Sequence, residues 1–114
     1  MSTSATYLGE LEQLLLLAIL QSGERAYTVP IRALLEERGA RRLSRGALFT
    51  SLDRLEAKGL VVSSMGAPLA IRGGRPRRYF EVTPAGLDAL RSAQATVRRL
   101  SEGLDLDALA ESGS

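Results

Sequence analysis

The sequence predicts one mainly α-helical domain with a small β-hairpin. Its 114 residues are enough for a single hydrophobic core. Apolar residues recur at helical spacing in several segments, and two short runs near the middle are rich in β-branched or aromatic residues. With 45% hydrophobic and 25% charged residues, the composition is ordinary for a globular protein. We therefore expect neither disorder nor a fibrous repeat.

The residue types that the chain lacks narrow its chemistry. It contains no cysteine and no histidine, which removes disulfides, thiolate nucleophiles, imidazole bases and the soft ligands of transition metals. The longest apolar run, Leu14 to Leu20, has seven residues, whereas a membrane-spanning helix needs about 20. We expect a soluble, cytoplasmic chain that is not an enzyme and has no metal, no cofactor and no membrane partner.

Two helices are predicted in the N-terminal third of the chain. The first covers residues 9–21 and is apolar on nearly every side, as expected of a central bundle helix or a helix at a subunit contact. The second begins near Thr28 as N-cap, with Pro30 in its first turn, and ends before Gly39. Its inward-facing residues are Ile31, Leu34 and Leu35.

The third predicted helix has two contrasting sides. Ser44 is expected to cap it and Lys58-Gly59 to end it. Its leucines follow the spacing i, i+4, i+7 and are Leu48, Leu52 and Leu55. The opposite side carries Gly46, Ala47, Thr50, Asp53, Arg54 and Ala57. Small and polar residues suit a helix that lies in a DNA groove, and an ordinary solvent-facing side is the alternative. Asp53 and Glu56 are expected to pair with basic residues of the same helix.

A hairpin is predicted after this helix. Its strands cover residues 60–65 and 77–83, with Phe80 and Val82 on one face. The connection contains Gly73-Gly74 flanked by arginines, which suits contact with a phosphate backbone or a minor groove. Loops of this composition also occur without such a function.

The last predicted helix begins at Thr83-Pro84 and runs to about residue 102. Its apolar residues are spaced 3, 4, 3, 4 and are Leu90, Ala93, Val97, Leu100 and Leu104. This spacing favours a seam against a second subunit, with packing on the helix's own domain as the alternative. We expect a domain over residues 8–83, a dimerisation helix over 84–104 and a tail over 105–114.

Charge is distributed unevenly along the chain. Residues 38–78 hold ten basic and two acidic residues, a net charge of +8, whereas residues 1–37 and 79–114 each carry −3. A basic middle between acidic ends is typical of a polyanion-binding face, and a solvated basic surface is the alternative. The predicted order of helix, helix, helix, strand, basic loop, strand and helix is that of a winged helix-turn-helix.

Several motifs resemble the PadR-like transcriptional regulators of bacteria. They are LGELE at residues 8–12, Ala26-Tyr27, SRGALFTSLDRLEAKGLV at 44–61, RGGRPRRYF at 72–80 and TPAG at 83–86. The resemblance covers residues 8–91 and implies a homodimeric repressor that binds double-stranded operator DNA and pairs through its last helix. Phe49 stands where the family usually has Tyr, and Thr28 where a Gly is common. Some short members bind planar drugs on aromatic side chains, whereas this chain has no Trp and no aromatic residue in its last helix.

The sequence therefore predicts DNA contacts from the third helix, the loop and the start of the second helix. The candidate residues are Tyr27, Ser44, Arg45, Gly46, Ala47, Phe49, Thr50, Arg54, Arg72, Gly73, Gly74, Arg75, Arg77 and Arg78. The target is expected to be a pseudo-palindrome, and a small-molecule inducer is left unspecified. The alternative function is a protein-interaction module, which would need an apolar patch on the third helix, where only Phe49 is available.

Overall fold

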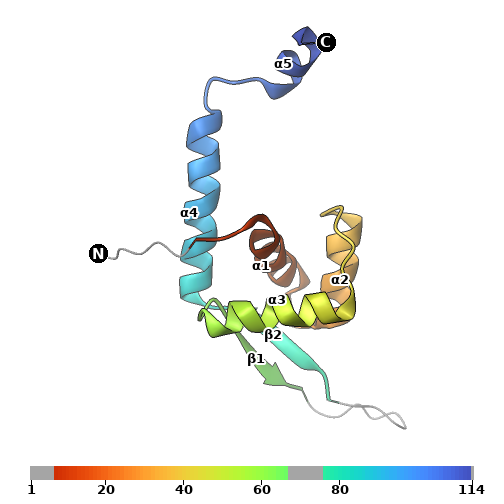
Figure 1. Cartoon of the computed structure of the whole chain (residues 1–114). Helices are drawn as coiled ribbons and strands as arrows, with labels where there is room; N and C mark the ends of the chain where they lie inside the picture. The colour runs from red at the N-terminus through yellow and green to blue at the C-terminus, as the bar shows by residue number, and fades with distance from the viewer. Residues whose placement is uncertain (1–6, 67–75, 114) are drawn as a thin grey trace.

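The computed structural model describes residues 7–66 and 76–113. Its helices are α1 (Glu10–Ser22), α2 (Thr28–Glu37), α3 (Arg45–Ala57), α4 (Pro84–Ser101) and α5 (Leu106–Ser112), with a 3-10 turn η1 (Gly23–Arg25) and strands β1 (Val61–Met65) and β2 (Arg78–Val82). The predicted fold class, mainly α with one hairpin, is confirmed. Figure 1 shows α3 and the hairpin at one end of the molecule and α5 at the other. Within the described ranges no helix is both long and apolar enough to cross a bilayer.

Helix α1 is the centre of the core, as its composition predicts. Leu15, Leu16 and Ile19 are buried in it, while Leu20 at its end is half-exposed. All three leucines of the predicted inner side of α3 are fully buried against this core. The i, i+4, i+7 spacing therefore identified the inward side of α3 correctly.

Helix α2 begins one residue earlier than predicted. Its N-cap is Tyr27, whose backbone is extended, and Thr28 is already helical and caps nothing. Pro30 stands in the first turn, where a backbone N–H would have no partner within the helix. At the other end the N–H of Gly39 donates to the carbonyl of Leu35 at 3.0 Å. A Cβ on Gly39 would lie 2.9 Å from that oxygen, and the positive φ falls on Ala40 instead.

The hairpin is antiparallel and pairs Val61 with Val82 and Met65 with Arg78. It is shorter than predicted at both ends. The N–H of Leu60 donates to the carbonyl of Leu55 at the end of α3, and Thr83 caps α4. The N–H of Phe80 donates to the carbonyl of Ala26 at 2.8 Å, so the link between α1 and α2 joins the hairpin through β2.

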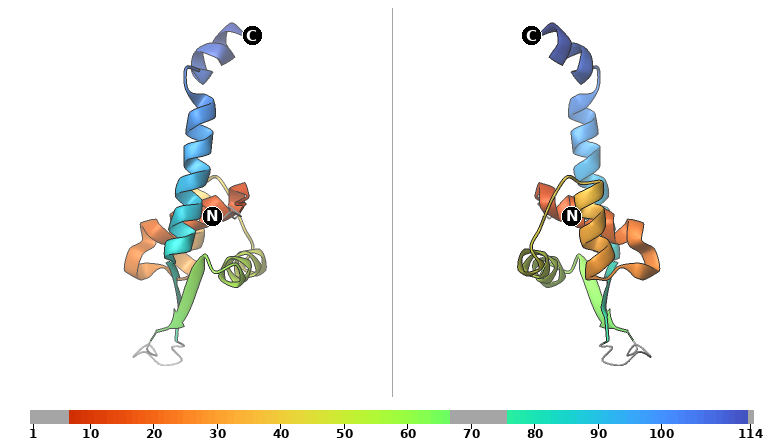
Figure 2. Two further views of the ribbon diagram at one scale, coloured as in Figure 1. Left: turned by 90° about the vertical axis from the view of Figure 1, so that its left-hand side faces the viewer. Right: turned by 90° about the vertical axis from the view of Figure 1, so that its right-hand side faces the viewer.

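Helix α4 starts inside the domain and leaves it. The hydroxyl of Thr83 accepts from the N–H of Gly86 at 3.0 Å and donates to the carbonyl of Gly59 at 2.7 Å. Gly86 lies so close to the carbonyl of Leu60 that a Cβ could not fit. Beyond its first half α4 extends away from the other helices, as the views in Figure 2 show. The segment predicted to be a tail contains α5, whose cap Asp105 accepts from the N–H of Ala108 at 3.1 Å.

Candidate nucleic-acid interface

The outward side of α3 has the composition that the sequence predicts. Its six small and polar residues are all exposed. Ser44 caps the helix by accepting from the N–H of Ala47 at 3.1 Å, and Arg45 is exposed beside it. A Cβ on Gly46 would meet nothing within 4 Å, so the fold does not require glycine there. A glycine on an open surface permits close approach by another molecule.

Phe49 does not form an apolar patch on α3. It is half-buried, and none of the exposed large hydrophobic residues in the described part of the chain belongs to this helix. The alternative function as a protein-interaction module therefore lacks the surface that it needs on α3.

The loop end of the hairpin contacts the start of α2 through aromatic rings. The guanidinium carbon of Arg77 lies 4.2 Å from the centroid of the Tyr27 ring. Tyr27 also packs edge-on against Tyr79, with ring centroids 5.6 Å apart and planes at 70°. A cation over an aromatic face is attracted by the ring's π electrons, so Tyr27 holds Arg77 beside the N-terminus of α2.

Arg78 makes different contacts on the other side of the strand. Its Nη2 lies 2.6 Å from Oε1 of Glu56 and 3.1 Å from Oδ1 of Asp53, both on α3. Its guanidinium carbon lies 4.9 Å from the centroid of the Phe80 ring. The prediction that Asp53 and Glu56 pair within their own helix is wrong, because β2 brings Arg78 between them.

Glu56 is a further contact between α3 and the hairpin. It accepts from the hydroxyl of Ser63 at 3.0 Å in addition to Arg78. The hydrogen bond from Ser63, followed by that from Arg78, holds the pKa of Glu56 below its ordinary value. Sequence reasoning missed Ser63, although the register that pairs it with Phe80 could have shown that it faces the same side as Arg78.

Ion pairs divide the basic residues of the central segment into two groups. Arg41 pairs with Glu10, Arg42 with Glu36 and Lys58 with Glu12. Burial raises the pKa of Glu12, but hydrogen bonds from Lys58 and Gly9 and the charges of Lys58 and Arg54 lower it overall.

The second group includes Arg45, Arg54 and Arg77, and the described residues place no carboxylate within ion-pair distance of these side chains. Arg45 and Arg54 belong to α3, and Arg77 lies at the loop end of the hairpin. The predicted residues Arg72, Gly73, Gly74 and Arg75 lie outside the described residues.

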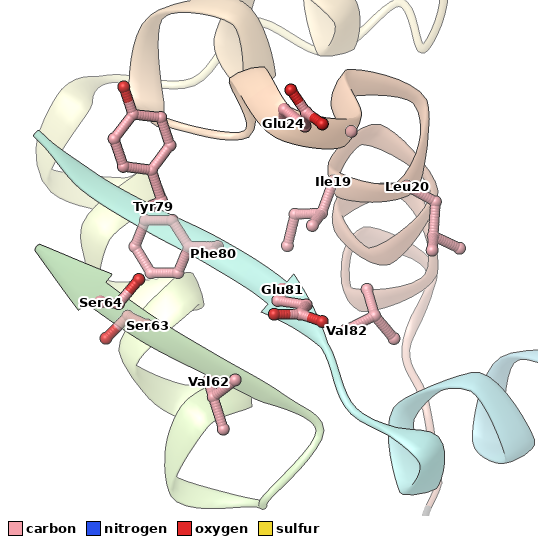
Figure 3. A pocket seen from close by; sticks show the side chains of 11 residues that line it. Ile19, Leu20, Glu24, Val62, Ser63, Ser64, Tyr79, Phe80, Glu81 and Val82 are labelled. Atoms are coloured by element: carbon pink, nitrogen blue, oxygen red, sulfur yellow. The ribbon is translucent and has the colours of Figure 1, made fainter. Parts of the chain in front are cut away.

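An open hollow lies between the end of α1, η1 and the hairpin (Figure 3). Its lining includes the carboxylates of Glu24 and Glu81 beside the apolar Leu20 and Val62. Carboxylates repel phosphate, so this hollow is unsuited to the nucleic-acid backbone.

The apolar seam of α4 divides into a buried and an exposed part. Leu90 is buried and Ala93 packs against the core. The remaining residues are Val97, Leu100 and Leu104, with exposed fractions of 59%, 78% and 56%. Leu106 and Leu109 of α5 are also exposed. Neither leucine is among the residues predicted from the sequence, although the Asp105 cap and the i, i+3 spacing could have indicated a helix.

Comparisons with known proteins agree with the fold and the motifs. The sequence pattern of the "Transcriptional regulator PadR-like family" matches residues 16–92. The transcriptional regulator Rv3488 of Mycobacterium tuberculosis is 40% identical over 60 residues, which cover 53% of this chain and 52% of that regulator. The chain thus matches about half the length of this relative.

Solved structures show the same likeness. A PadR family transcriptional regulator from Eggerthella lenta is 30% identical, with a TM-score of 0.64 over 90% of this chain and 87% of that one. A PadR-like transcription factor from Bacteroides fragilis is 26% identical, with a TM-score of 0.64 over 81% of this chain and 84% of that one.

Proposed function

Because the chain belongs to the PadR-like family of transcriptional regulators, which are not enzymes, we propose that it is a repressor that binds operator DNA as a homodimer. The observation that carries the proposal is the outward side of α3, which presents small and polar residues with Arg45 and Arg54. Neither of these arginines, nor Arg77 of the hairpin, has an ion pair within the described ranges. An exposed helix that carries arginines without an ion pair, beside a basic hairpin, complements the shape and charge of a DNA groove.

Helix α3 is the proposed recognition helix in the major groove. Thr50 near its middle and Arg54 in its last turn are exposed and can hydrogen-bond to base edges. Ser44, Arg45, Gly46 and Ala47 form its N-terminal turn and set how closely the helix approaches. Phe49 lies at the flank of this surface, where it lacks the hydroxyl of the Tyr usual in the family.

The hairpin supplies the proposed contacts with the backbone or the adjacent minor groove. Arg77 is presented there by its contact with Tyr27. Residues Arg72, Gly73, Gly74 and Arg75 continue the same basic segment. Such contacts contribute affinity for any duplex, because they are made to phosphate rather than to bases.

We assign subunit pairing to the exposed part of the seam, Val97, Leu100 and Leu104. Large apolar side chains on one helix side are unfavourable in water, and burying each contributes about 1.5 to 3 kcal/mol. A two-fold dimer reads a pseudo-palindrome whose half-sites are about 10 to 10.5 base pairs apart, or a multiple of that spacing. Light scattering of the full chain tests the pairing, and a monomer at micromolar concentration would contradict it.

The test of DNA binding begins with a duplex that wild-type protein selects from a random-sequence pool. This duplex and a scrambled one are titrated at several salt concentrations. Arg77→Ala should weaken binding to both and lower the salt slope by about 0.9 for each phosphate that is no longer neutralised. Thr50→Ala should weaken mainly the selected duplex.

Arg98→Ala is the matched control, because it removes the same charge from the exposed side of α4, away from α3. It should leave both affinities nearly unchanged. DNA binding is disproved if wild-type protein selects no duplex and shows no salt-dependent affinity for any.

A further inference from the structure

Arg77 and Arg78 are neighbours in sequence, yet their guanidinium groups lie in opposite environments. We infer that Arg78 is a positioning residue, which fixes the hairpin against α3 and offsets one of its two negative charges, whereas Arg77 is left available to phosphate. The inference rests on the proposed function, because it concerns how the same surface binds DNA.

The guanidinium of Arg78 contacts two carboxylates through Nη2. One side chain joins Asp53 and Glu56, which lie one turn apart on α3. Its guanidinium also lies over Phe80, which is buried in the core. Charge-assisted hydrogen bonds are short and directional, so this arginine fixes the distance between β2 and the C-terminal half of α3.

Charge explains why this cluster does not attract phosphate. Arg78 carries one positive charge between two carboxylates, and the set therefore has a net charge of −1. Without Arg78, α3 would present two negative charges beside a groove lined by phosphates. Its contribution to affinity is therefore the removal of repulsion and the alignment of two elements.

Strand geometry explains the division of roles. Successive side chains of a strand point to opposite faces, and Arg77 immediately precedes β2. Arg77 contacts Tyr27 at the start of α2, while Arg78 contacts α3. The two arginines thus connect the loop end of the hairpin to α2 and α3, the two helices of the helix-turn-helix.

The decisive variant is Glu56→Gln, because the two possible roles of Arg78 predict different results. If Arg78 is a phosphate contact restrained by Glu56, the variant will bind the selected and the scrambled duplex more tightly by the same factor, which leaves the ratio of the two affinities unchanged. If Arg78 is a positioning residue, the ratio of the two affinities will fall by roughly tenfold, as expected on losing a charge-assisted hydrogen bond that aligns a binding element. The ratio is informative because phosphate attraction acts on both duplexes and cancels.

Glu36→Gln is the matched control. It removes the carboxylate of an exposed ion pair with Arg42, whose atoms are 2.9 Å apart, and should leave the ratio unchanged. Ser63→Ala is a milder second variant, which removes one donor to Glu56 and should lower the ratio less. Circular dichroism and thermal unfolding establish that each variant is folded.

A double-mutant cycle completes the test. Arg78→Gln and Glu56→Gln should each lower the ratio, and the double variant should lose no more than the more damaging single one, since both disrupt one contact. Additive losses, or an unchanged ratio in Glu56→Gln, would overturn the inference. If wild-type protein shows no preference for the selected duplex, the proposed function itself fails, which is a distinct result.

Discussion

The domain and the C-terminal arm, residues 97–113, use leucine in opposite ways. In the domain Leu15 and Leu16 of α1 and all three leucines of α3 are buried by their own chain. In the arm every residue is exposed, including Leu100, Leu104, Leu106 and Leu109. The same residue type at the same helical spacing therefore forms a core in one region and an unfilled surface in the other. The spacing shows which side of a helix is apolar, and the tertiary structure decides what covers it.

The largest expected effect comes from charging the arm. Val97→Glu with Leu100→Glu should convert a dimer to a monomer, because the seam would have two fewer apolar side chains to bury and would gain like charges. Light scattering measures the mass. Leu87→Glu, at an exposed residue of the same helix away from the seam, should leave the assembly intact. A dimer in both variants would mean that the subunits pair through another surface.

A truncation in each region comes next. Leu52→Ala should lower the free energy of unfolding by about 2 to 5 kcal/mol, because it opens a cavity in the core. Leu109→Ala should change it by less than about 0.5 kcal/mol, as expected of an exposed residue. Urea unfolding measures both. Equal losses would mean that α5 is buried against another subunit.

The close packing at the N-terminus of α4 can be tested by adding one methyl group. Gly86→Ala would place a Cβ against the carbonyl of Leu60 and 2.9 Å from Cγ1 of Val82. We expect a loss of about 1 to 3 kcal/mol, typical of overpacking, and a lower melting temperature. Gly46→Ala is the control, because its Cβ meets open space. Because alanine favours helix more than glycine, Gly46→Ala should lose no stability, and a comparable loss in that variant would contradict the role of the contact with Leu60.

The smallest expected effect is on the stability of the protein at acid pH. The pKa of Glu12 is lower in the folded protein than its ordinary value of 4.5, so the folded state binds this proton less tightly than the unfolded chain. The stabilisation is present above about pH 4.5 and is lost as the pH falls toward the folded pKa. Glu12→Gln should lower the free energy of unfolding by less than about 1 kcal/mol at neutral pH. It should also make the decrease of that free energy at acid pH less steep. Urea unfolding at a series of pH values from 6 to 3 measures this dependence. The same dependence of unfolding free energy on pH in wild type and variant would disprove the prediction.

Local patterns predicted most of the fold. Ser44, Thr83 and the buried leucines of α3 mark their elements through interactions between residues a few positions apart. The errors arose where a distant segment decides the outcome. Glu56 binds Arg78 because β2 folds back onto α3, which no local spacing indicates.

The candidate site was predictable in composition more than in contacts. The outward side of α3 follows directly from helical periodicity. The separate environments of Arg77 and Arg78 depend on the exact start and register of β2, and one residue of shift would exchange them. The start of α2 depends likewise on Tyr27, whose ring contacts Arg77 and Tyr79.

The junction between α3 and α4 determines more than the stability of one helix. Thr83 donates to the carbonyl of Gly59 through its hydroxyl and to that of Leu60 through its N–H, so the axis of α4 is fixed relative to that of α3. If two subunits pair through α4 as proposed, the crossing angle of the two α4 helices determines the separation of the two recognition helices. A molecule that altered this angle would change the operator spacing that the dimer accepts without contacting a single DNA-binding residue.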